Sequence, residues 1–523
     1  MYPGVTKNLV KNSAIVSALS ALGVISALVV DLAVAAYYGA GTHADAFFIA
    51  STLPSLVVGS LLTTVQVVMV PIMVSVSHTH SSHDAQYIIS AIINAGFVFW
   101  ILCSGLAIAL TPLLFPILAP GAQKAVVFES IGLGQLLFIM LPMTWLTESL
   151  KAALNAQRRF TLAAAMLFVA NVAALATITL CARSLGIWAA ALGYVIRTCS
   201  PIPILLIAYR AGDGRYLLTL GWKYRAQVVE AFRLLALRMG VILIRDSDTL
   251  LERFLASFLP TGAIAGLAYA QRAATGLETI LAGGTASVIM PDLSSLSVRR
   301  QKQDEQHLLA TGIKLVWLVT LPVVGICIAL SYPIISLLFM RGQFDQTATG
   351  LTSVLFSLYL LGTPFSALVR ITLAAFYAAR DARTPALHMA YMLVINTILL
   401  LLMFPMVGVL AVPLAASATY VLSLLRSFWL LHRNGFRLDE SRWTMSKALI
   451  AAVAVSGIVG WGYFRLDVSQ AHVILRLGWL LLVGGMGLCV YFAVLIGLRV
   501  KETGWILALV RRARTGVNAL LGF

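Results

Sequence analysis

The chain has 523 residues, of which 60% are hydrophobic and 11% are charged. A soluble domain carries about 25% charged residues, so this composition excludes a soluble protein and indicates many membrane spans. An open sheet leaves backbone groups unsatisfied in lipid, and the sequence lacks the alternating pattern of a membrane barrel. We therefore expect an all-α, polytopic membrane protein.

Apolar runs long enough to cross the bilayer recur from one end of the chain to the other. We predict about fourteen transmembrane helices, roughly at residues 13–38, 46–75, 86–110, 127–152, 161–182, 187–208, 227–258, 263–296, 309–331, 349–378, 385–404, 407–431, 446–464 and 473–498. An even number of spans places both termini on the same side of the membrane.

The net charge of +17 follows this predicted topology. About 23 Lys and Arg residues lie on the side of the termini, whereas the opposite loops hold about four, namely Lys124, Arg183, Arg341 and Arg465. Cytoplasmic loops carry the excess of basic residues, so both termini are predicted to be cytoplasmic. The basic balance is thus explained by topology, and we expect no nucleic-acid partner.

Several sequence motifs recur about 220 residues apart. The stretch 39–77 returns at 262–297, 109–121 at 329–342, 152–158 at 374–380, and 186–189 at 408–411. This predicts two parallel repeats, an N-terminal lobe at 1–210 and a second lobe at 227–432, joined by a cytoplasmic linker at 211–226. Two extra helices and a basic tail fill residues 433–523. In transporters built this way, the substrate site lies between the halves.

Charged residues within predicted spans are costly in lipid and are therefore candidates for function. The first six spans contribute Asp31, Asp45 and Arg197. The seventh is the richest, with Arg238, Arg245, Asp246, Asp248, Glu252 and Arg253, and the eighth and tenth add Arg272, Glu278 and Arg370. Spacings of three and four place Arg245, Asp248 and Glu252 on one helix face. Ion pairing that only fixes helix packing is the alternative interpretation of these charges.

An arginine in a cleft suits a phosphate, because its planar fork donates two hydrogen bonds and stays charged. The predicted substrate-binding set is Arg272, Asp45, Asp31, Arg245, Arg238, Arg253 and Arg370. The carboxylates Asp248, Glu252 and Asp31 are the candidates for coupling an ion. Together they predict a transporter that moves an anionic amphiphile by alternating access, without catalytic residues.

Other polar features are assigned ordinary roles. The five cysteines lack metal or redox spacing, so we expect no metal site. The histidine-rich loop at 78–83 is predicted to be solvated, and Glu148 and Lys151 are predicted to form a surface pair. The sequence has no phosphate-binding loop of the G-x-x-x-x-G-K-[ST] type, which counts against an ATP-driven pump.

Nine stretches resemble the MurJ/MviN family of lipid II flippases, within the multidrug/oligosaccharidyl-lipid/polysaccharide exporter superfamily. They are Gly39–Gly41, Asp45–Phe48, Leu53–Pro54, Ala153–Asn155, Arg159–Phe160, Ala256–Leu259, Tyr269–Arg272, Leu338–Phe344 and Phe376–Pro385. The resemblance implies fourteen helices, two six-helix lobes in a V shape and a central cavity. It also implies transport of an undecaprenyl-pyrophosphate-linked saccharide for peptidoglycan synthesis across the bacterial inner membrane. The family implies no cofactor; a Na⁺ or H⁺ gradient or the membrane potential drives transport, and cell-wall enzymes are the expected partners.

The chain departs from the family where the family carries basic residues in the first two spans. Here those positions are Val24, Val30, Val58 and Gly59, whereas Arg272 and Asp45 are kept. Arg238, Arg245, Arg253 or Arg370 are predicted to replace the missing arginines. Three alternatives stay open: a flippase for another lipid-linked glycan, an ion-coupled multidrug exporter, and a non-transporting scaffold of a glycan-assembly complex.

Overall fold

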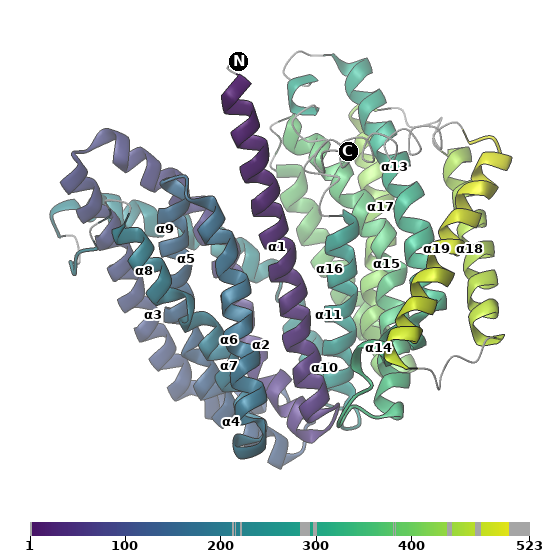
Figure 1. Cartoon of the computed structure of the whole chain (residues 1–523), viewed down its shortest axis with the longest axis horizontal. Coiled ribbons are helices and arrows are strands. Elements are labelled where there is room, and N and C mark those ends of the chain that lie inside the picture. The colour runs from purple at the N-terminus through teal and green to yellow at the C-terminus, as the bar shows by residue number, and fades with distance from the viewer. Residues whose placement is uncertain are drawn as a thin grey trace. The chain divides into compact units, whose positions relative to one another are not determined.

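The computed structural model describes residues 3–211, 214, 216–219, 222–282, 293–296, 301–379, 381, 383–436, 442–465 and 472–500. Helices form all of the regular structure in these ranges, without a β-strand (Figure 1). The all-α prediction is therefore confirmed. The chain forms two compact units, the first of residues 1–268 and 341–348, and the second of residues 269–340 and 349–523.

Among the described residues, the first unit contains the first residues of the helix that begins at Gln346, together with ten complete helices and the start of an eleventh. They are α1 (Pro3–Tyr38), α2 (Thr42–Thr79), α3 (Ser82–Leu118), α4 (Lys124–Phe138), α5 (Met140–Ala156), α6 (Phe160–Leu185), α7 (Trp188–Cys199), α8 (Pro201–Arg210), α9 (Arg225–Arg245), α10 (Asp248–Ala256) and α11 (Ala263–Ala282). A short 3-10 turn, η1 (Trp222–Tyr224), precedes α9. Helix α1 packs along α6, and α2 lies against α4 and α5. Phe47 and Trp145 are among its largest fully buried side chains.

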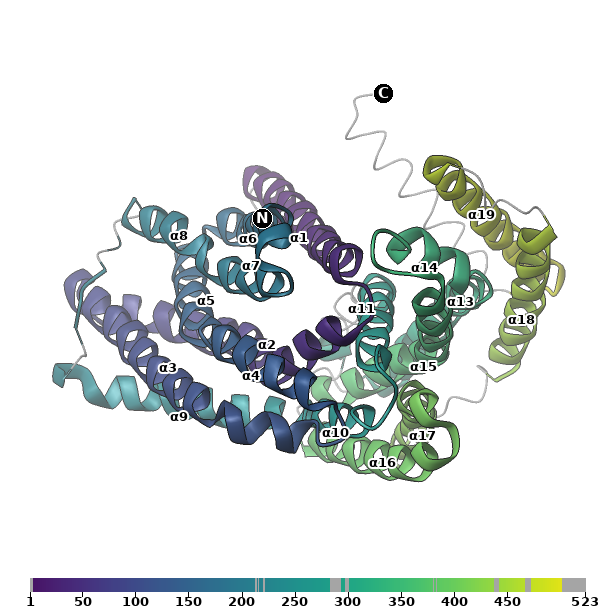
Figure 2. The same ribbon diagram turned by 90° about the horizontal axis from the view of Figure 1, so that it is seen from below.

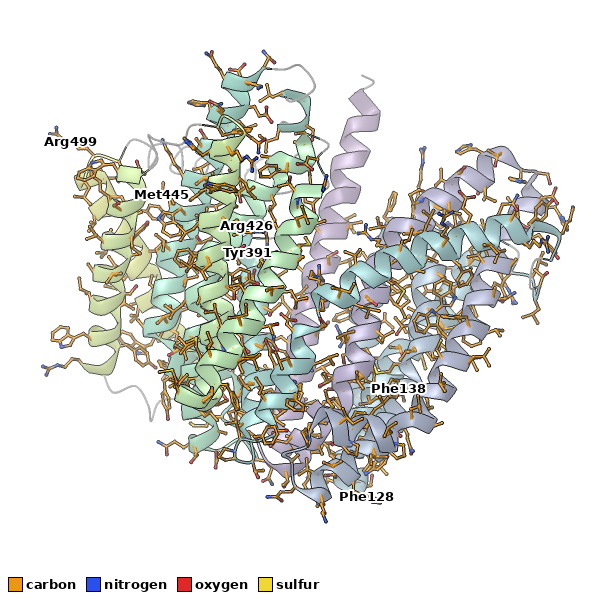
Figure 3. The ribbon with its side chains drawn as sticks, turned by 180° about the vertical axis from the view of Figure 1, so that it is seen from behind. Phe128, Phe138, Tyr391, Arg426, Met445 and Arg499 are labelled. Carbon is orange, nitrogen blue, oxygen red and sulfur yellow. The ribbon has the colours of Figure 1, made fainter. Side chains whose placement is uncertain are left out.

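The second unit contains the end of α11 and the helices that follow it. They are α13 (Lys302–Ala329), α14 (Ser331–Phe339), α15 (Gln346–Ala378), α16 (Arg383–Val407), α17 (Ala411–Arg433), α18 (Arg442–Arg465) and α19 (Val473–Gly497), with the 3-10 turn η2 (Gly408–Leu410) before α17. The two extra helices α18 and α19 pack beside α13 (Figure 2). Arg426 of α17 packs against Tyr391 of α16, and its guanidinium lies 4.3 Å from the ring centre of Tyr391 (Figure 3).

Eleven helical segments in the described ranges are long and apolar enough to span a membrane. One of them, Arg383–Arg433, has 51 residues and contains both α16 and α17. Helix α9 is not among the eleven because it carries many charges, and α10 is too short because it has only 9 residues. The 20 described residues of α11 are not apolar enough. The protein is therefore a multi-pass membrane protein. The predicted V shape and central cavity stay predictions.

Glycine conformations support the predicted internal repeat. Gly186 and Gly408, which the sequence pairs, have φ of +55° and +56°, and the paired Gly39 and Gly262 have φ of +62° and +91°. Residues with a Cβ adopt such values at a cost, so both copies need glycine at the same turn. Part of one predicted repeat copy, residues 283–292, lies outside the described residues.

The compact units do not end where the predicted lobes end. The sequence assigned α9 and α10 to the second lobe, yet both pack against α2 and α3 in the first unit. An apolar stripe explains this packing, because Ala231, Leu235 and Ile242 of α9 are buried. The ring of Phe232 also stacks on Trp145 of α5, with 5.9 Å between ring centres.

Candidate functional site

The carboxylate of Asp45 holds the start of α11. Asp45 lies in the first turn of α2 and is 4% exposed. Its Oδ2 accepts a hydrogen bond from the backbone N–H of Gly262 at 2.6 Å, and its Oδ1 accepts one from Ala265 at 2.8 Å. The first N–H groups of a helix lack partners within the helix and attract negative charge. Asp45 therefore caps α11 from a helix more than 200 residues away in sequence.

The glycines of this junction allow the chain to approach closely. The Gly262 turn lies against the carbonyl oxygen of Ala40, and a Cβ at Gly342 would collide with the carbonyl oxygen of Ala36. The same carbonyl of Ala36 accepts a hydrogen bond from the N–H of Gln343 at 2.9 Å. The predicted motif residues 39–41, 45 and 341–344 thus meet in one junction of the first unit.

Asp31 is partly buried in α1 and is hydrogen-bonded to α7. The hydroxyl of Tyr194 donates to Asp31 Oδ1 at 3.0 Å. The ring of Tyr194 also packs edge-on against Phe47 of α2, with 5.3 Å between ring centres. This carboxylate is therefore positioned by two neighbouring helices, and its predicted role in substrate or ion binding stays a prediction.

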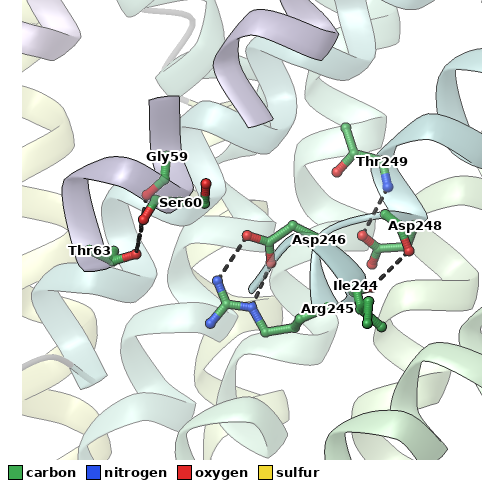
Figure 4. Close-up of polar contacts among 9 residues, drawn as sticks. Gly59, Ser60, Thr63, Ile244, Arg245, Asp246, Asp248 and Thr249 are labelled. Atoms are coloured by element: carbon green, nitrogen blue, oxygen red, sulfur yellow. Dashed lines mark hydrogen bonds and ion pairs between the residues drawn. The ribbon is translucent and has the colours of Figure 1, made fainter. Parts of the chain in front are cut away.

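The charged seventh span is not one continuous helix. Helix α9 ends at Arg245 and α10 begins at Asp248, so the prediction that Arg245, Asp248 and Glu252 share one helix face was wrong. Local polar contacts compete with helical hydrogen bonds here. The guanidinium of Arg245 binds the carboxylate of Asp246 at 2.5 and 2.9 Å, and Ser247 Oγ donates to a carbonyl of the preceding turn (Figure 4).

The other charges of α9 and α10 differ in burial. Arg238 is exposed on α9, whereas Glu252 and Arg253 are both buried in α10. Arg253 donates to the backbone carbonyl of Ile264 at 3.4 Å, and Asp248 Oδ1 accepts from the N–H of Thr249 at 2.9 Å.

In the second unit, Arg370 of α15 forms an ion pair with Glu278 of α11. The hydroxyl of Ser366 donates to the same carboxylate at 2.7 Å. Arg272 lies partly buried on α11, close in sequence to the fully buried Tyr269. The structure therefore brings Arg370 and Glu278 together and leaves the predicted substrate-binding role of Arg272 as a prediction.

A cavity of about 140 Å³ with a mostly apolar lining lies in the first unit, among α2, α5, α6 and α7. Its lining includes Val58, Thr144, Glu148, Lys151 and Arg197. The predicted pair of Glu148 with Lys151 is confirmed, but its predicted place at the surface was wrong, because Glu148 is only 2% exposed. The sequence did not indicate this burial, because Glu148 and Lys151 are three residues apart near a helix end, where such pairs are commonly exposed.

The carboxylate of Glu148 is fully engaged within this cavity wall. Its Oε1 accepts a hydrogen bond from Lys151 Nζ at 2.8 Å, and its Oε2 accepts one from Gln66 Nε2 at 2.8 Å. Gln66 in turn accepts a hydrogen bond from Asn155 Nδ2 at 2.9 Å. The carboxylate of Glu148 therefore has one cationic donor and one amide donor, and Asn155 orients that amide.

The four positions where the sequence lacks the expected basic residues have different surroundings. Val30 is buried and Val24 is exposed, both on α1. On α2, Val58 lines the cavity described above, and a Cβ at Gly59 would meet no atom within 4 Å. The sequence predicted that Arg197 lies within the sixth span, but it carries no signal that Arg197 and Val58 line the same cavity.

Comparison with known proteins places the chain in a family. The family model described as lipid II flippase MurJ matches residues 34–477. A probable lipid II flippase MurJ from Vibrio cholerae serotype O1 is 25% identical over 538 residues, covering 95% of this chain and 98% of the relative. The lipid II flippase MurJ of Burkholderia cenocepacia is 23% identical and covers 88% of this chain and 91% of its own.

Solved structures show the same fold. A lipid II flippase MurJ in an inward closed conformation aligns with a TM-score of 0.76 at 18% identity, covering 91% of this chain and 97% of the other. A multidrug-resistance MATE transporter of the MOP superfamily aligns with a TM-score of 0.65 at 13% identity, covering 79% of this chain and 95% of the other. Because the family model spans most of the 523 residues, the chain belongs to the lipid II flippase family, MurJ.

Proposed function

We propose that this protein translocates lipid II, an undecaprenyl-pyrophosphate-linked saccharide, from the inner to the outer leaflet of the bacterial cytoplasmic membrane. The family match over residues 34–477 carries this proposal. The many membrane-spanning helices and the likeness of the fold to a solved flippase support it. It is a transporter rather than an enzyme.

The proposed cycle needs a site that holds a diphosphate and then releases it on the other side. Arg272 is the residue that we assign first to the diphosphate, because it matches the family motif and an arginine binds phosphate with two hydrogen bonds. Asp31, Asp248 and Glu252 are the proposed sites for coupling to Na⁺, H⁺ or the membrane potential. Both termini are proposed to be cytoplasmic, because the basic residues gather on that side.

A second cargo is favoured by one observation. Val24, Val30, Val58 and Gly59 stand where the resemblance expects basic residues, so the diphosphate or the sugar is held differently. A hydrogen bond to a charged group contributes about 1.5–3 kcal/mol, so the loss of several would alter cargo preference unless other residues replace them. Another lipid-linked glycan is therefore the alternative cargo.

Complementation tests the choice between these cargoes. A bacterial host is depleted of its own lipid II flippase and expresses this chain, its Arg272→Ala variant, or an Arg183→Ala control. Arg183 is an exposed arginine at the end of α6, so the control removes a charge without touching the proposed site. We expect growth with the parent and the control but not with Arg272→Ala. A folded parent that fails to restore growth would contradict lipid II as the cargo.

A further inference from the structure

A second cavity lies in the second unit, where α13 begins and α15 and α17 end. Its volume is about 500 Å³, within the range of about 300–1,000 Å³ that is typical of sites for small ligands. The three helices belong to membrane-spanning segments. Because the cavity lies at their ends, it is placed near the level where the bilayer meets water.

Glu305 of α13 is the buried charge of this cavity. It lines the cavity and is only 6% exposed. Within the part of the chain that the structure describes, its carboxylate has no hydrogen bond and no ion pair. Its oxygens are not among the fully covered polar atoms that lack a partner, so they stay open to the cavity. Buried carboxylates are nearly always paired, so Glu305 indicates a cationic guest.

Lys302 supplies a separate positive charge to the same cavity. It lies one turn before Glu305 on α13 and is exposed, so its ammonium is at the mouth. A spacing of three residues allows pairing, as Lys151 and Glu148 show at 2.8 Å in the first unit. Among the described residues, however, no ion pair joins Lys302 to Glu305. The cavity therefore presents a buried negative charge and an outer positive charge that remain separate.

Two amide side chains add acceptors to the cavity. Gln306 Nε2 donates to the carbonyl of Gly435 at 2.8 Å, and Asn434 Nδ2 donates to the carbonyl of Leu430 at 2.8 Å. Both amide oxygens are left as acceptors, and the nearby C-terminal ends of α15 and α17 attract positive charge. Asp381, the other carboxylate of the lining, already accepts two backbone N–H groups. A primary ammonium has three donors, which one carboxylate and two amide oxygens can match.

The size and the lining of the cavity select the class of the guest. A metal ion is far smaller than 500 Å³, and the described residues contain no group of three or more His, Cys, Asp or Glu that could hold one. Phe376, Leu431 and Phe436 form an apolar wall that suits a carbon chain better than a hydrated ion. A guest with an inner ammonium and an outer anion matches both Glu305 and Lys302. The head group of an aminophospholipid has this charge pattern.

We propose that the cavity binds the head group of phosphatidylethanolamine, with its ammonium on Glu305 and its phosphate beside Lys302. This ligand is a lipid of the bilayer and differs from the proposed cargo, so the inference goes beyond the proposed function. The bound lipid connects the start of α13 with the ends of α15 and α17. A ligand that binds only the folded protein raises its stability, so the lipid should stabilise the second unit.

Lipid binding to the purified full chain tests this site. The protein in detergent is titrated with phosphatidylethanolamine or phosphatidylcholine, and bound lipid is counted by native mass spectrometry. The two head groups differ in the methyl groups on nitrogen, and a trimethylammonium donates no hydrogen bond. Because a hydrogen bond to a charged group contributes about 1.5–3 kcal/mol, we expect phosphatidylethanolamine to bind about tenfold more tightly. Equal binding of the two lipids by the parent would overturn the inference.

Variants at the two charges identify the charge pattern of the guest. Glu305→Gln should abolish most of the preference for phosphatidylethanolamine. Lys302→Gln should weaken binding several-fold, because the phosphate loses a cation, and its exposed position keeps the fold intact. Tighter phosphatidylethanolamine binding by Lys302→Gln would indicate recognition of the amine alone, and tighter binding by Glu305→Gln would indicate an anion site. Either result would contradict the inference.

The matched control is Asp304→Asn, which removes an exposed carboxylate from the same turn of α13 and does not alter the lining. It is expected to bind both lipids like the parent. Competition by soluble glycerophosphoethanolamine distinguishes the source of the head group: effective competition at a concentration equal to that of the lipid would contradict a membrane lipid as the ligand. An unchanged preference in both Glu305→Gln and Lys302→Gln, with normal thermal unfolding, would also overturn the inference.

Discussion

Replacing Asp45 tests whether this carboxylate is the cap that holds α11. Both of its oxygens accept a backbone N–H, from Gly262 at 2.6 Å and from Ala265 at 2.8 Å, in a buried site. A hydrogen bond to a charged group contributes about 1.5–3 kcal/mol, so losing both costs about 3 kcal/mol or more. Every 1.4 kcal/mol is about tenfold in an equilibrium constant, so Asp45→Ala should raise local opening roughly 100-fold. Asp45→Asn keeps one acceptor oxygen, and we expect about tenfold.

Hydrogen exchange followed by mass spectrometry on a peptide covering residues 260–268 measures this opening. Asp381→Asn is the matched control, because Asp381 Oδ1 also accepts two backbone N–H groups, from Arg383 and Thr384 at 3.0 Å, but at a partly exposed site. The control should leave residues 260–268 unchanged. Exchange there within threefold of the parent in Asp45→Ala would refute the capping argument. It would favour the predicted role of Asp45 in substrate binding instead.

Three further predictions follow from single contacts. A double-mutant cycle on Arg370 and Glu278, read by chemical unfolding, should give a coupling of at most about 1 kcal/mol, because Arg370 is 50% exposed; a coupling above about 2 kcal/mol would contradict this. Gly342→Ala should lower the thermal unfolding temperature, because φ is +59° and the new Cβ meets a carbonyl of α1, whereas Gly350→Ala in open space within α15 should not. Hydrogen bonds from the side chain and backbone of Thr384 hold the pKa of Asp381 below its usual 3.8. The contribution of Asp381 to the stability of the α16 start is therefore present above pH 4 and is lost as the pH falls through that lowered pKa. Hydrogen exchange at residues 383–384, corrected for intrinsic rates, should show this loss in the parent but not in Asp381→Asn.

The helices and the repeat were predictable because they rest on local signals. Span-length apolar runs fix where α2 and α15 lie, and glycines at the repeated turns mark Gly186 and Gly408 as equivalent positions. Such patterns need no knowledge of what a helix packs against.

The tertiary partners of charged residues were not predictable in the same way. Glu148 has the sequence context of an exposed helix end, and only the packing of α2 with its Gln66 makes it buried. The break between Arg245 and Asp248 depends on local contacts of Asp246 and Ser247, which helical spacing alone does not reveal. The cavity beside Val58 and Arg197 arises from helices far apart in sequence.

Direct observation of lipid movement tests the proposed function most sharply. The purified chain is reconstituted into liposomes that carry fluorescent lipid II in the inner leaflet, and a membrane-impermeant quencher outside reports its arrival in the outer leaflet. An ion gradient or a membrane potential is applied in turn. We predict quenching that requires the protein, is lost in Arg272→Ala and persists in Arg183→Ala. Quenching no faster than in protein-free liposomes, with folded protein in the bilayer, would contradict lipid II transport by this chain.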